Sequence, residues 1–404
     1  MNVVYIVGAG LSKALERSGF RVPMMNDFVS VSADYMERDV ARIIFTSLRA
    51  LEPCFQWPIL APEQNASGAA IQSYANALRR RPAENIEDLL AAASGSKRTL
   101  ATRVRYLINR LFVLLDWNVD DLPLRRLLGK QFSRPTTRHT LISFNYDLFL
   151  DRVVQETLPS WSVATGYGFP AAGYVLSDPE PGPPGPDVLS FTGSKTTCPV
   201  VILKPHGSLN WLVPLAERLP MGDAGLLFAD EPPIIPLRED GGLRYCAATS
   251  DFQYVYPQSG HPIDVLPAIV PPVQKKDFGL GFLRNLLEME RRAVADADEI
   301  FIIGWSMPKT DANQITLIRD AIARRTKKRR LTVINRGAAP EYFTRVAEVF
   351  AVQRSGLRVF NSGFDDFVHA ELNSSPHALM GCAAATLAAV AALLMRLASS
   401  LRPN

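Results

Sequence analysis

The sequence predicts an α/β protein in which a mostly parallel sheet carries helices on both faces and a helical insertion subdomain. The first observation is Val3–Val7, five β-favouring residues that run directly into Gly8–Gly10, as a buried strand turning into a helix would. The second is a complete strand, helix and strand unit expected over residues 299–334. The third is helical periodicity from about Ser30 to Leu128. Together these features are typical of a Rossmann-like fold.

The glycine turn after the first strand is a candidate phosphate site. Gly8 and Gly10 let the backbone bend tightly and approach a ligand. The amide groups and the partial positive charge of a helix start favour an anion. The same pattern also occurs where a turn merely has to be tight, so both interpretations stay open at this stretch.

The next predicted strand, His139–Phe144, follows a helical insertion placed at residues 30–138. It delivers Asn145 and Asp147 before an amphipathic helix expected over Leu148–Glu156. Open α/β sheets bind ligands at the carboxyl ends of their strands, which favours a ligand role for both residues. The alternative is that either side chain simply caps the helix.

His206 follows another predicted strand, Val200–Leu203, after a Gly- and Pro-rich stretch over residues 160–199 that predicts a loop with little regular structure. Histidine is the side chain best suited to accept a proton near neutral pH, although a single histidine in a turn is more often structural. Gly8, Asn145 and His206 all follow predicted strands, as one ligand along one sheet edge requires.

The second half of the chain contains the strand, helix and strand unit. Its strands are expected at Glu299–Ile303 and Leu331–Ile334, with a helix over Asp311–Arg325 between them. Gly304, Ser306 and Asn335 follow these strands and could hold phosphate, ribose or adenine. Asn335 is equally well explained as a turn residue before Gly337. A helix over Leu280–Ala297 precedes the unit, and a strand within Val349–Phe360 follows it.

Composition limits the class of protein. The 404 residues carry a net charge of only +4, so direct nucleic-acid binding is not expected. The cation-rich run Arg324–Arg330 is interpreted as a solvated helix end. Four cysteines stand far apart without a close pair, and no signal segment precedes the first strand, so we expect a cytoplasmic protein without a structural zinc site.

The C-terminal segment, residues 371–404, is expected to form an alanine-rich helix. Residues 378–395 are almost entirely Ala, Leu, Val and Met. This length reaches the lower limit for a membrane span. The segment is interpreted as a packing or oligomerisation helix, with tethering to a membrane as the alternative, because small residues serve both.

Four motifs together resemble the sirtuin-like (silent-information-regulator-type) family of NAD-binding domains, particularly its bacterial antiphage-defence branch of NAD hydrolases. The resemblance covers residues 1–370, which we take as one catalytic domain. The motifs are Gly8-Ala9-Gly10-Leu11-Ser12, Phe144-Asn145-Tyr146-Asp147, His206-Gly207-Ser208, and Gly304-Trp305-Ser306 with Asn335.

This resemblance implies NAD binding between a Rossmann domain and a smaller domain. Gly8, Ala9, Gly10 and Ser12 would line the phosphates and the nearby ribose. Asn145 and Asp147 would face the nicotinamide ribose, and Gly304, Ser306 and Asn335 the adenosine half. Asn145 and His206 would be the catalytic residues, the first orienting a water and the second acting as the base.

Two features of the deacylating sirtuins are missing. The chain lacks their paired zinc cysteines, and residues 19–28 do not carry their proline-aspartate-phenylalanine-arginine signature. The resemblance therefore implies an NAD+ glycohydrolase that yields nicotinamide and ADP-ribose as an antiphage, abortive-infection effector, with NAD as substrate and no zinc. The alternatives are an NAD-dependent deacylase or ADP-ribosyltransferase, and a non-catalytic subunit that senses NAD or ADP-ribose.

The resemblance also implies partners. We expect a homo-oligomer regulated by a separately encoded protein, an ATPase or an Argonaute-type protein, because an enzyme that destroys NAD must be kept inactive until it is triggered.

Overall fold

A computed structural model gives the fold. It describes residues 1–17, 21–24, 26–37, 41–55, 67–81, 86, 88–89, 104, 107–112, 119–134, 136–169, 171–175, 198–214, 233–238, 240–243, 254–255, 262–263, 265–270, 281–324 and 328–373.

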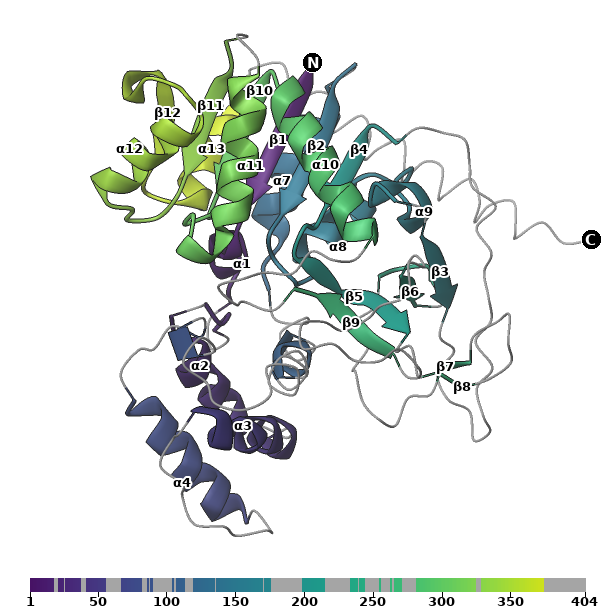
Figure 1. The fold of residues 1–404 in the computed structure, drawn as a ribbon, viewed down its shortest axis with the longest axis vertical. Coiled ribbons are helices and arrows are strands. Elements are labelled where there is room, and N and C mark those ends of the chain that lie inside the picture. The colour runs from purple at the N-terminus through teal and green to yellow at the C-terminus, as the bar shows by residue number, and fades with distance from the viewer. Residues whose placement is uncertain are drawn as a thin grey trace, which may run out of the picture.

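The described strands and helices alternate along much of the chain (Figure 1). The strands are β1 (Asn2–Val7), β2 (Arg138–Ser143), β3 (Ala172–Val175), β4 (Val200–Leu203), β5 (Gly207–Pro214), β6 (Ile234–Leu237), β7 (Tyr254–Val255), β8 (Pro262–Ile263), β9 (Val265–Ile269), β10 (Glu299–Ile303), β11 (Arg330–Ile334) and β12 (Leu357–Phe360). The α-helices are α1 (Ala9–Ala14), α2 (Phe28–Asp34), α3 (Ala41–Phe55), α4 (Gly68–Arg79), α7 (Leu122–Phe132), α8 (Phe149–Thr157), α9 (Val163–Gly166), α10 (Gly281–Asp296), α11 (Ala312–Ala323), α12 (Pro340–Val349) and α13 (Phe364–Asn373). Three short 3₁₀ helices are η1 (Tyr35–Glu37), η2 (Lys309–Asp311) and η3 (Arg354–Gly356).

The main sheet has six strands in the order β12-β11-β10-β1-β2-β4, and every neighbouring pair is parallel. The chain builds outward from β1 to β4 on one side, returns to the middle at β10 and builds outward to β12 on the other. This is the doubly wound Rossmann order. Val3–Val7 of β1 are fully buried because β1 lies at the centre with helices over both faces. The predicted Rossmann-like fold class is confirmed.

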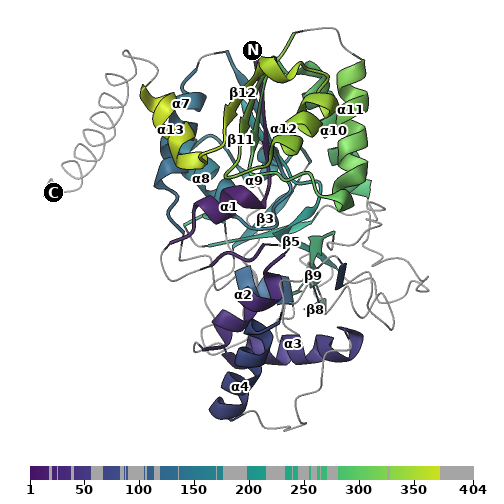
Figure 2. The same cartoon turned by 90° about the vertical axis from the view of Figure 1, so that its left-hand side faces the viewer.

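Helices cover both faces of this sheet. Figure 2 shows α10, α11 and α12 on one side of the strands and α7, α8 and α13 on the other. Buried Leu283, Leu286 and Val294 of α10 recur at helical spacing, which explains why this long amphipathic segment packs against β1 and β4.

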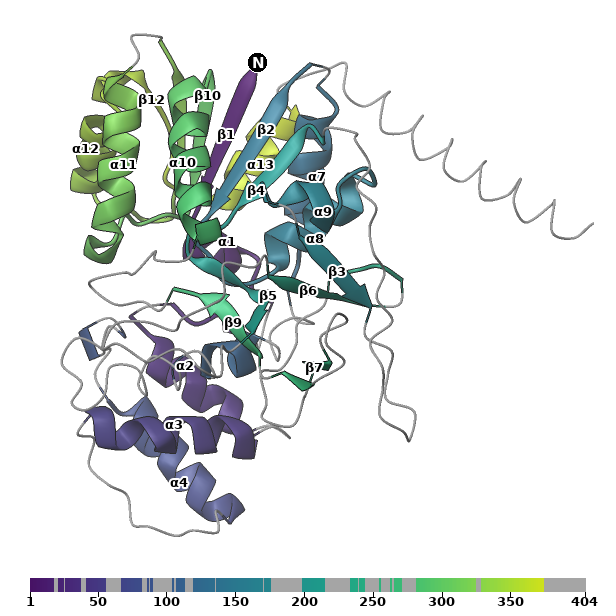
Figure 3. The same cartoon turned by 45° about the vertical axis from the view of Figure 1, so that its right-hand side comes forward.

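Beyond the carboxyl ends of the main strands lie a second sheet and a helical unit. Figure 3 shows β5, β9, β6 and β3 below the main sheet, and α2, α3 and α4 below them. The second sheet has the order β3-β6-β5-β9, and β5 is antiparallel to both of its neighbours. At the start of β5, Gly207 has a φ of +81°, and a Cβ there would lie 1.7 Å from the carbonyl oxygen of Ala268. Only glycine fits this entry into the sheet.

The local predictions are confirmed for β1, β2, β4, β10 and β11 and for helices α8, α10 and α11. The expected loop over residues 160–199 is wrong in part, because α9 and β3 lie within it. β3 pairs with β6, a partner about sixty residues away in sequence, and loop composition carries no signal for such pairing. Within the expected helical insertion, α2 and α4 pack together, whereas α7 packs against α8 and α13.

The alanine-rich segment 378–395 lies outside the described residues. Among the helices that the structure describes, none is long and apolar enough to cross a membrane.

Candidate active site at the carboxyl edge of the main sheet

The predicted site residues follow the carboxyl ends of five parallel strands and therefore lie along one edge of the main sheet. The centre of that edge, between β1 and β10, is where the order of winding reverses, and open α/β folds bind ligands at this point. Gly8 follows β1, Asn145 and Asp147 follow β2, His206 follows β4, Gly304 and Ser306 follow β10, and Asn335 follows β11.

Ser12, Asn145 and Asp147 form one hydrogen-bonded chain at this edge. The amide nitrogen of Asn145 donates to the carbonyl of Gly8 at 3.1 Å and to Ser12 Oγ at 2.9 Å. Ser12 Oγ in turn donates to Asp147 Oδ2 at 2.6 Å. Asp147 Oδ1 accepts from the amide of Phe149 at 3.2 Å, so its helix-capping role is real but uses only one of its two oxygens.

This chain fixes the orientation of the Asn145 carboxamide. Ser12 donates its only proton to Asp147, so Ser12 Oγ must accept from Asn145, and the carbonyl of Gly8 can only accept. The nitrogen of the carboxamide therefore faces Ser12 and Gly8, and Oδ1 points elsewhere. Among the residues that the structure describes, none donates a hydrogen bond to Asn145 Oδ1. That oxygen is placed to accept from a ligand hydroxyl or a water.

Burial acts on the charge of Asp147. It raises the pKa of this fully buried carboxyl, while the positive charge of Lys204 and the hydrogen bond from Ser12 act in the opposite direction.

His206 packs against the backbone that precedes Asn145. Its Nδ1 lies 3.3 Å from the carbonyl oxygen of Phe144, and the two rings are 5.0 Å apart. A carbonyl oxygen only accepts hydrogen bonds, so Nδ1 carries the hydrogen and Nε2 is the nitrogen that gains or loses a proton. Nε2 lies 3.5 Å from Asp311 Oδ1, with both side chains almost completely buried.

Asp311 reaches this edge from the other half of the sheet. It is the last residue of η2 and precedes α11, where an aspartate usually caps the helix, but its side chain makes no capping bond. Asp311 Oδ2 instead accepts from the indole nitrogen of Trp305 at 2.9 Å. The Trp305 ring lies 5.0 Å from that of Phe144. Three buried aromatic and imidazole rings and one carboxylate thus connect the ends of β2, β4 and β10.

Glu290 of α10 lies near Asp311 and is fully buried. Neither of its carboxyl oxygens has a hydrogen-bond partner in the structure as described. Burial, and then the negative charge of Asp311, raise its pKa well above the ordinary value. Asp311 is the carboxyl group that faces His206.

On the opposite side of the site, Lys204 is completely buried and paired. Its Nζ donates to the carbonyl of Asp147 and, at 3.0 Å, to Asp151 Oδ2. Asp151 Oδ1 accepts from the hydroxyl of Tyr167 at 2.7 Å. These contacts hold the backbone of Asp147 in place with both charges compensated.

The glycines of the first turn serve the packing of the protein itself. A Cβ on Gly8 would lie 2.6 Å from the Cα of Trp305, and one on Gly10 would lie 2.7 Å from the Cα of Gly304. The amides of Gly8 and Gly10 donate to the carbonyls of Ile303 and Gly304. In this turn the amide of Ala9 makes no hydrogen bond to the described residues, so Ala9 is the position where the backbone can bind an anion.

Two predicted residues lie outside the hydrogen-bonded centre. Ser306 is exposed in the turn after β10. Asn335 Oδ1 accepts from the amide of Arg336 at 2.9 Å, and its side chain bonds the hydroxyl of Tyr342, which donates to the carbonyl of Trp305. Asn335 thus behaves as a turn residue in this structure, although its loop is tied to the turn after β10.

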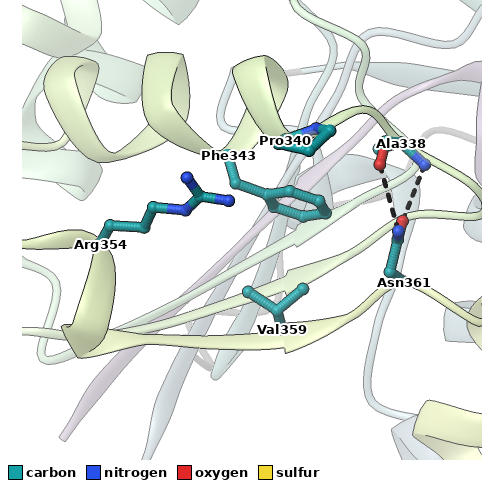
Figure 4. Close-up of a pocket in the computed structure, with 6 residues that line it drawn as sticks. All are labelled: Ala338, Pro340, Phe343, Arg354, Val359 and Asn361. Atoms are coloured by element: carbon teal, nitrogen blue, oxygen red, sulfur yellow. Dashed lines mark hydrogen bonds between the residues drawn. The ribbon is translucent and has the colours of Figure 1, made fainter.

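A separate pocket lies beside the edge strand β12 (Figure 4). Its volume is about 400 Å³, and it is lined by Ala338, Pro340, Phe343, Arg354, Val359 and Asn361. Both ends of the Asn361 carboxamide are bonded to the backbone of Ala338. None of the residues predicted from the sequence lines this pocket.

The described residues contain no group of three or more His, Cys, Asp or Glu side chains that could hold a metal ion.

Sequence reasoning missed Asp311, Glu290 and Lys204. Asp311 carried only the signal of a helix start, and Glu290 only that of a helical residue. Lys204 had a detectable signal, because a lysine directly after a buried strand and before Pro205 has few ways to reach solvent.

Neither a protein-family model nor a curated protein sequence matches the chain. Among solved structures, the chain is similar to Sir2 bound to an acetylated peptide, with 12% identity, a TM-score of 0.32 and 92% of each chain covered. It is similar to Sir2 with a p53 peptide and NAD+ at 12% identity and a TM-score of 0.33, with 92% of each chain covered. Likeness at this level does not place the chain in a family, so the chemistry of the site rests on the geometry above.

Proposed function

We propose that this chain is an NAD+ glycohydrolase that cleaves NAD+ to nicotinamide and ADP-ribose. The observation that carries the proposal is the Asn145 carboxamide. Its nitrogen is held by Gly8 and Ser12, its oxygen accepts no hydrogen bond from the described residues, and His206 contacts the carbonyl of Phe144, the residue before Asn145. A fixed acceptor next to a proton-accepting imidazole suits the activation of water.

The reaction needs little else from the protein. The bond between C1′ of the ribose and the pyridinium nitrogen breaks, and its electron pair neutralises nicotinamide as the leaving group. Positive charge builds on the ribose, and a water oxygen bonds to C1′. Asn145 Oδ1 would orient that water and His206 Nε2 would accept its proton, which then passes to solvent.

The rest of NAD+ would lie along the sheet edge. The Ala9 amide and the turn formed by Gly8, Gly10 and Gly304 suit the phosphates, because this turn lies at the point where the winding of the sheet reverses. Ser12 and Asp147 hold Asn145 and lie on the nicotinamide ribose side. Ser306 and Asn335 belong to the loops that we assign to the adenosine half.

The decisive experiment is a time course of NAD+, nicotinamide and ADP-ribose with the purified full chain. We expect Asn145→Ala and His206→Ala each to reduce turnover by about 100-fold or more. Ser12→Ala should reduce it by about 10-fold, because Asn145 then loses one of its two anchors. Ser133→Ala, at an exposed serine that directly follows α7, is the matched control.

Two results would contradict the hydrolase. If NAD+ is consumed only when an acyl-lysine peptide is present, the chain is a deacylase. If calorimetry shows NAD+ or ADP-ribose binding and turnover stays at the level of Asn145→Ala, the chain is a binding subunit.

We further propose that the enzyme is an antiphage effector that acts as a homo-oligomer under a separately encoded ATPase or Argonaute-type regulator. The support is the motif resemblance and the need to restrain an activity that depletes NAD+. Co-purification from cells and mass measurement of the purified chain test these assignments, and measuring the membrane-bound fraction with and without residues 378–395 tests tethering.

A further inference from the structure

His206 and Asp311 come from opposite halves of the main sheet. His206 follows β4 and Asp311 follows β10, and the strands β1 and β2 lie between these two in the sheet. The 3.5 Å contact between Nε2 and Oδ1 therefore spans the ends of β1 and β2. It lies at the same sheet edge as Asn145, which follows β2.

The carboxylate of Asp311 is held in a defined orientation. Trp305 donates to Oδ2 at 2.9 Å, and the amides of the helix that Asp311 precedes donate no hydrogen bond to its side chain. The other oxygen then faces the imidazole. At 3.5 Å the carboxylate acts on His206 mainly through its charge, and burial of both side chains strengthens that effect.

The titratable groups around His206 leave Asp311 as its counter-charge. Tyr146 lies with its ring 6.4 Å from the imidazole, and its hydroxyl donates to the carbonyl of Val270. Glu290 is buried without a hydrogen-bond partner in the described structure, and burial raises the pKa of its carboxyl. Asp147 is engaged by Ser12 and by the amide of Phe149.

We propose that Asp311 is a positioning residue that orients the imidazole of His206 and stabilises its protonated form during cleavage of NAD+. The inference rests on the proposed function. When Nε2 takes the proton of the attacking water, the imidazolium is formed 3.5 Å from the carboxyl oxygen of Asp311. Nδ1 keeps its own hydrogen on the carbonyl of Phe144 throughout, and the proton on Nε2 leaves to solvent after nicotinamide departs.

The test is a histidine NMR titration of the full chain together with steady-state kinetics of NAD+ cleavage. The chain has five histidines, so the His206 signal is assigned with His206→Gln. In Asp311→Asn we expect the titration midpoint of His206 to fall by about one pH unit, because the nearby negative charge is lost. The kcat should fall by about 10- to 100-fold with KM changed by less than about threefold.

Two further variants separate positioning from folding. Asp311→Glu keeps the charge and should return the His206 midpoint toward that of the wild type. Glu290→Gln replaces a buried carboxyl whose pKa is raised with an amide of similar shape and should leave the midpoint in place. An unchanged midpoint in Asp311→Asn, or an equal shift in Glu290→Gln, overturns the proposal.

The titration needs no turnover. If the wild-type chain fails to cleave NAD+ but Asp311→Asn still lowers the His206 midpoint, the hydrolase assignment fails and the coupling of the two residues stands. If the wild type cleaves NAD+ and the midpoint does not move, the proposal for Asp311 fails alone.

Discussion

Two clusters of buried polar side chains lie beside the site, and their hydrogen-bonding groups find partners to very different degrees. In the lysine network, formed by Lys204, Asp151, Tyr167 and Asp147, each charged or hydroxyl group meets a partner at hydrogen-bond distance. In the carboxyl cluster, formed by His206, Asp311 and Glu290, His206 Nε2 and Asp311 Oδ1 are 3.5 Å apart, and the oxygens of Glu290 have no hydrogen-bond partner among the described residues.

The difference distinguishes a structural network from a cluster that can take part in proton transfer. A fully bonded buried pair is rigid and costly to disturb, which suits the backbone beneath Asn145. An imidazole beside a carboxylate at a longer distance can exchange a proton without breaking a short bond. The sequence places Lys204 and His206 only two residues apart, yet they belong to these opposite classes.

Breaking the lysine network should have the largest effect. Lys204→Met leaves Asp151 buried without its counter-charge, and we expect unfolding free energy to fall by about 3 to 5 kcal/mol in denaturant titrations. Adding Asp151→Asn should recover part of this loss. Lys328→Met removes an exposed lysine and should stay within about 0.5 kcal/mol of the wild type. Equal effects of the two lysine variants would contradict the network.

A third buried titratable group, His139 on β2, tests how the burial of a histidine makes stability depend on pH. Burial, and then the charge of Arg134, lower its pKa from 6.5 to about 4. Between these values the unfolded chain binds a proton that the folded chain does not, so stability falls as pH drops from 6.5 to 4, by about 3 kcal/mol in total. His139→Phe should remove this part of the pH dependence, measured by denaturant titrations across that range. If the stability of the variant still falls as pH drops over this range, other groups cause the pH dependence.

The turn after β10, which leads to Asp311 of the carboxyl cluster, tests how tightly the backbone is packed at the sheet edge. Gly304 has a φ of +61°, and a Cβ there would lie 2.5 Å from the backbone of Gly10 and Leu11. Gly337 has nearly the same φ of +63° with open space around it. Both alanine variants strain the backbone through the positive φ, but only the Cβ at residue 304 also clashes. The free energy of unfolding of Gly304→Ala should therefore fall by about 2 kcal/mol more than that of Gly337→Ala in thermal or denaturant unfolding. Similar losses of unfolding free energy in the two variants would mean that the turns after β1 and β10 can move apart.

The smallest effect is expected at Glu290. Its raised pKa means that above pH 4.5 the folded chain retains a proton that the unfolded chain releases, so this group lowers stability as pH rises. Glu290→Gln should therefore be more stable than the wild type at pH 7 by at least about 1 kcal/mol, and the gap should close toward pH 4.5. A variant that is less stable at pH 7 would show that Glu290 is ionised and paired.

Much of the site could be predicted because its signals are local. Asn145, Asp147 and His206 each follow a short apolar run, and polar residues after a buried strand lie at the sheet edge where open α/β folds bind ligands. The helix-cap interpretation of Asp147 is partly confirmed, since one of its oxygens bonds the amide of Phe149. The sequence predicts Asp311 only as a helix start, and a helix start has the same local signal whether its carboxylate caps the helix or faces a distant histidine.

The sequence alone determined the α/β class, the five buried strands β1, β2, β4, β10 and β11, and the polar residues at their ends, because burial periodicity and turn residues act over a few positions. The tertiary structure decided the strand order, the second sheet and the meeting of His206 with Asp311. These depend on which distant segments pack together, and packing energy between distant segments leaves no pattern within either of them.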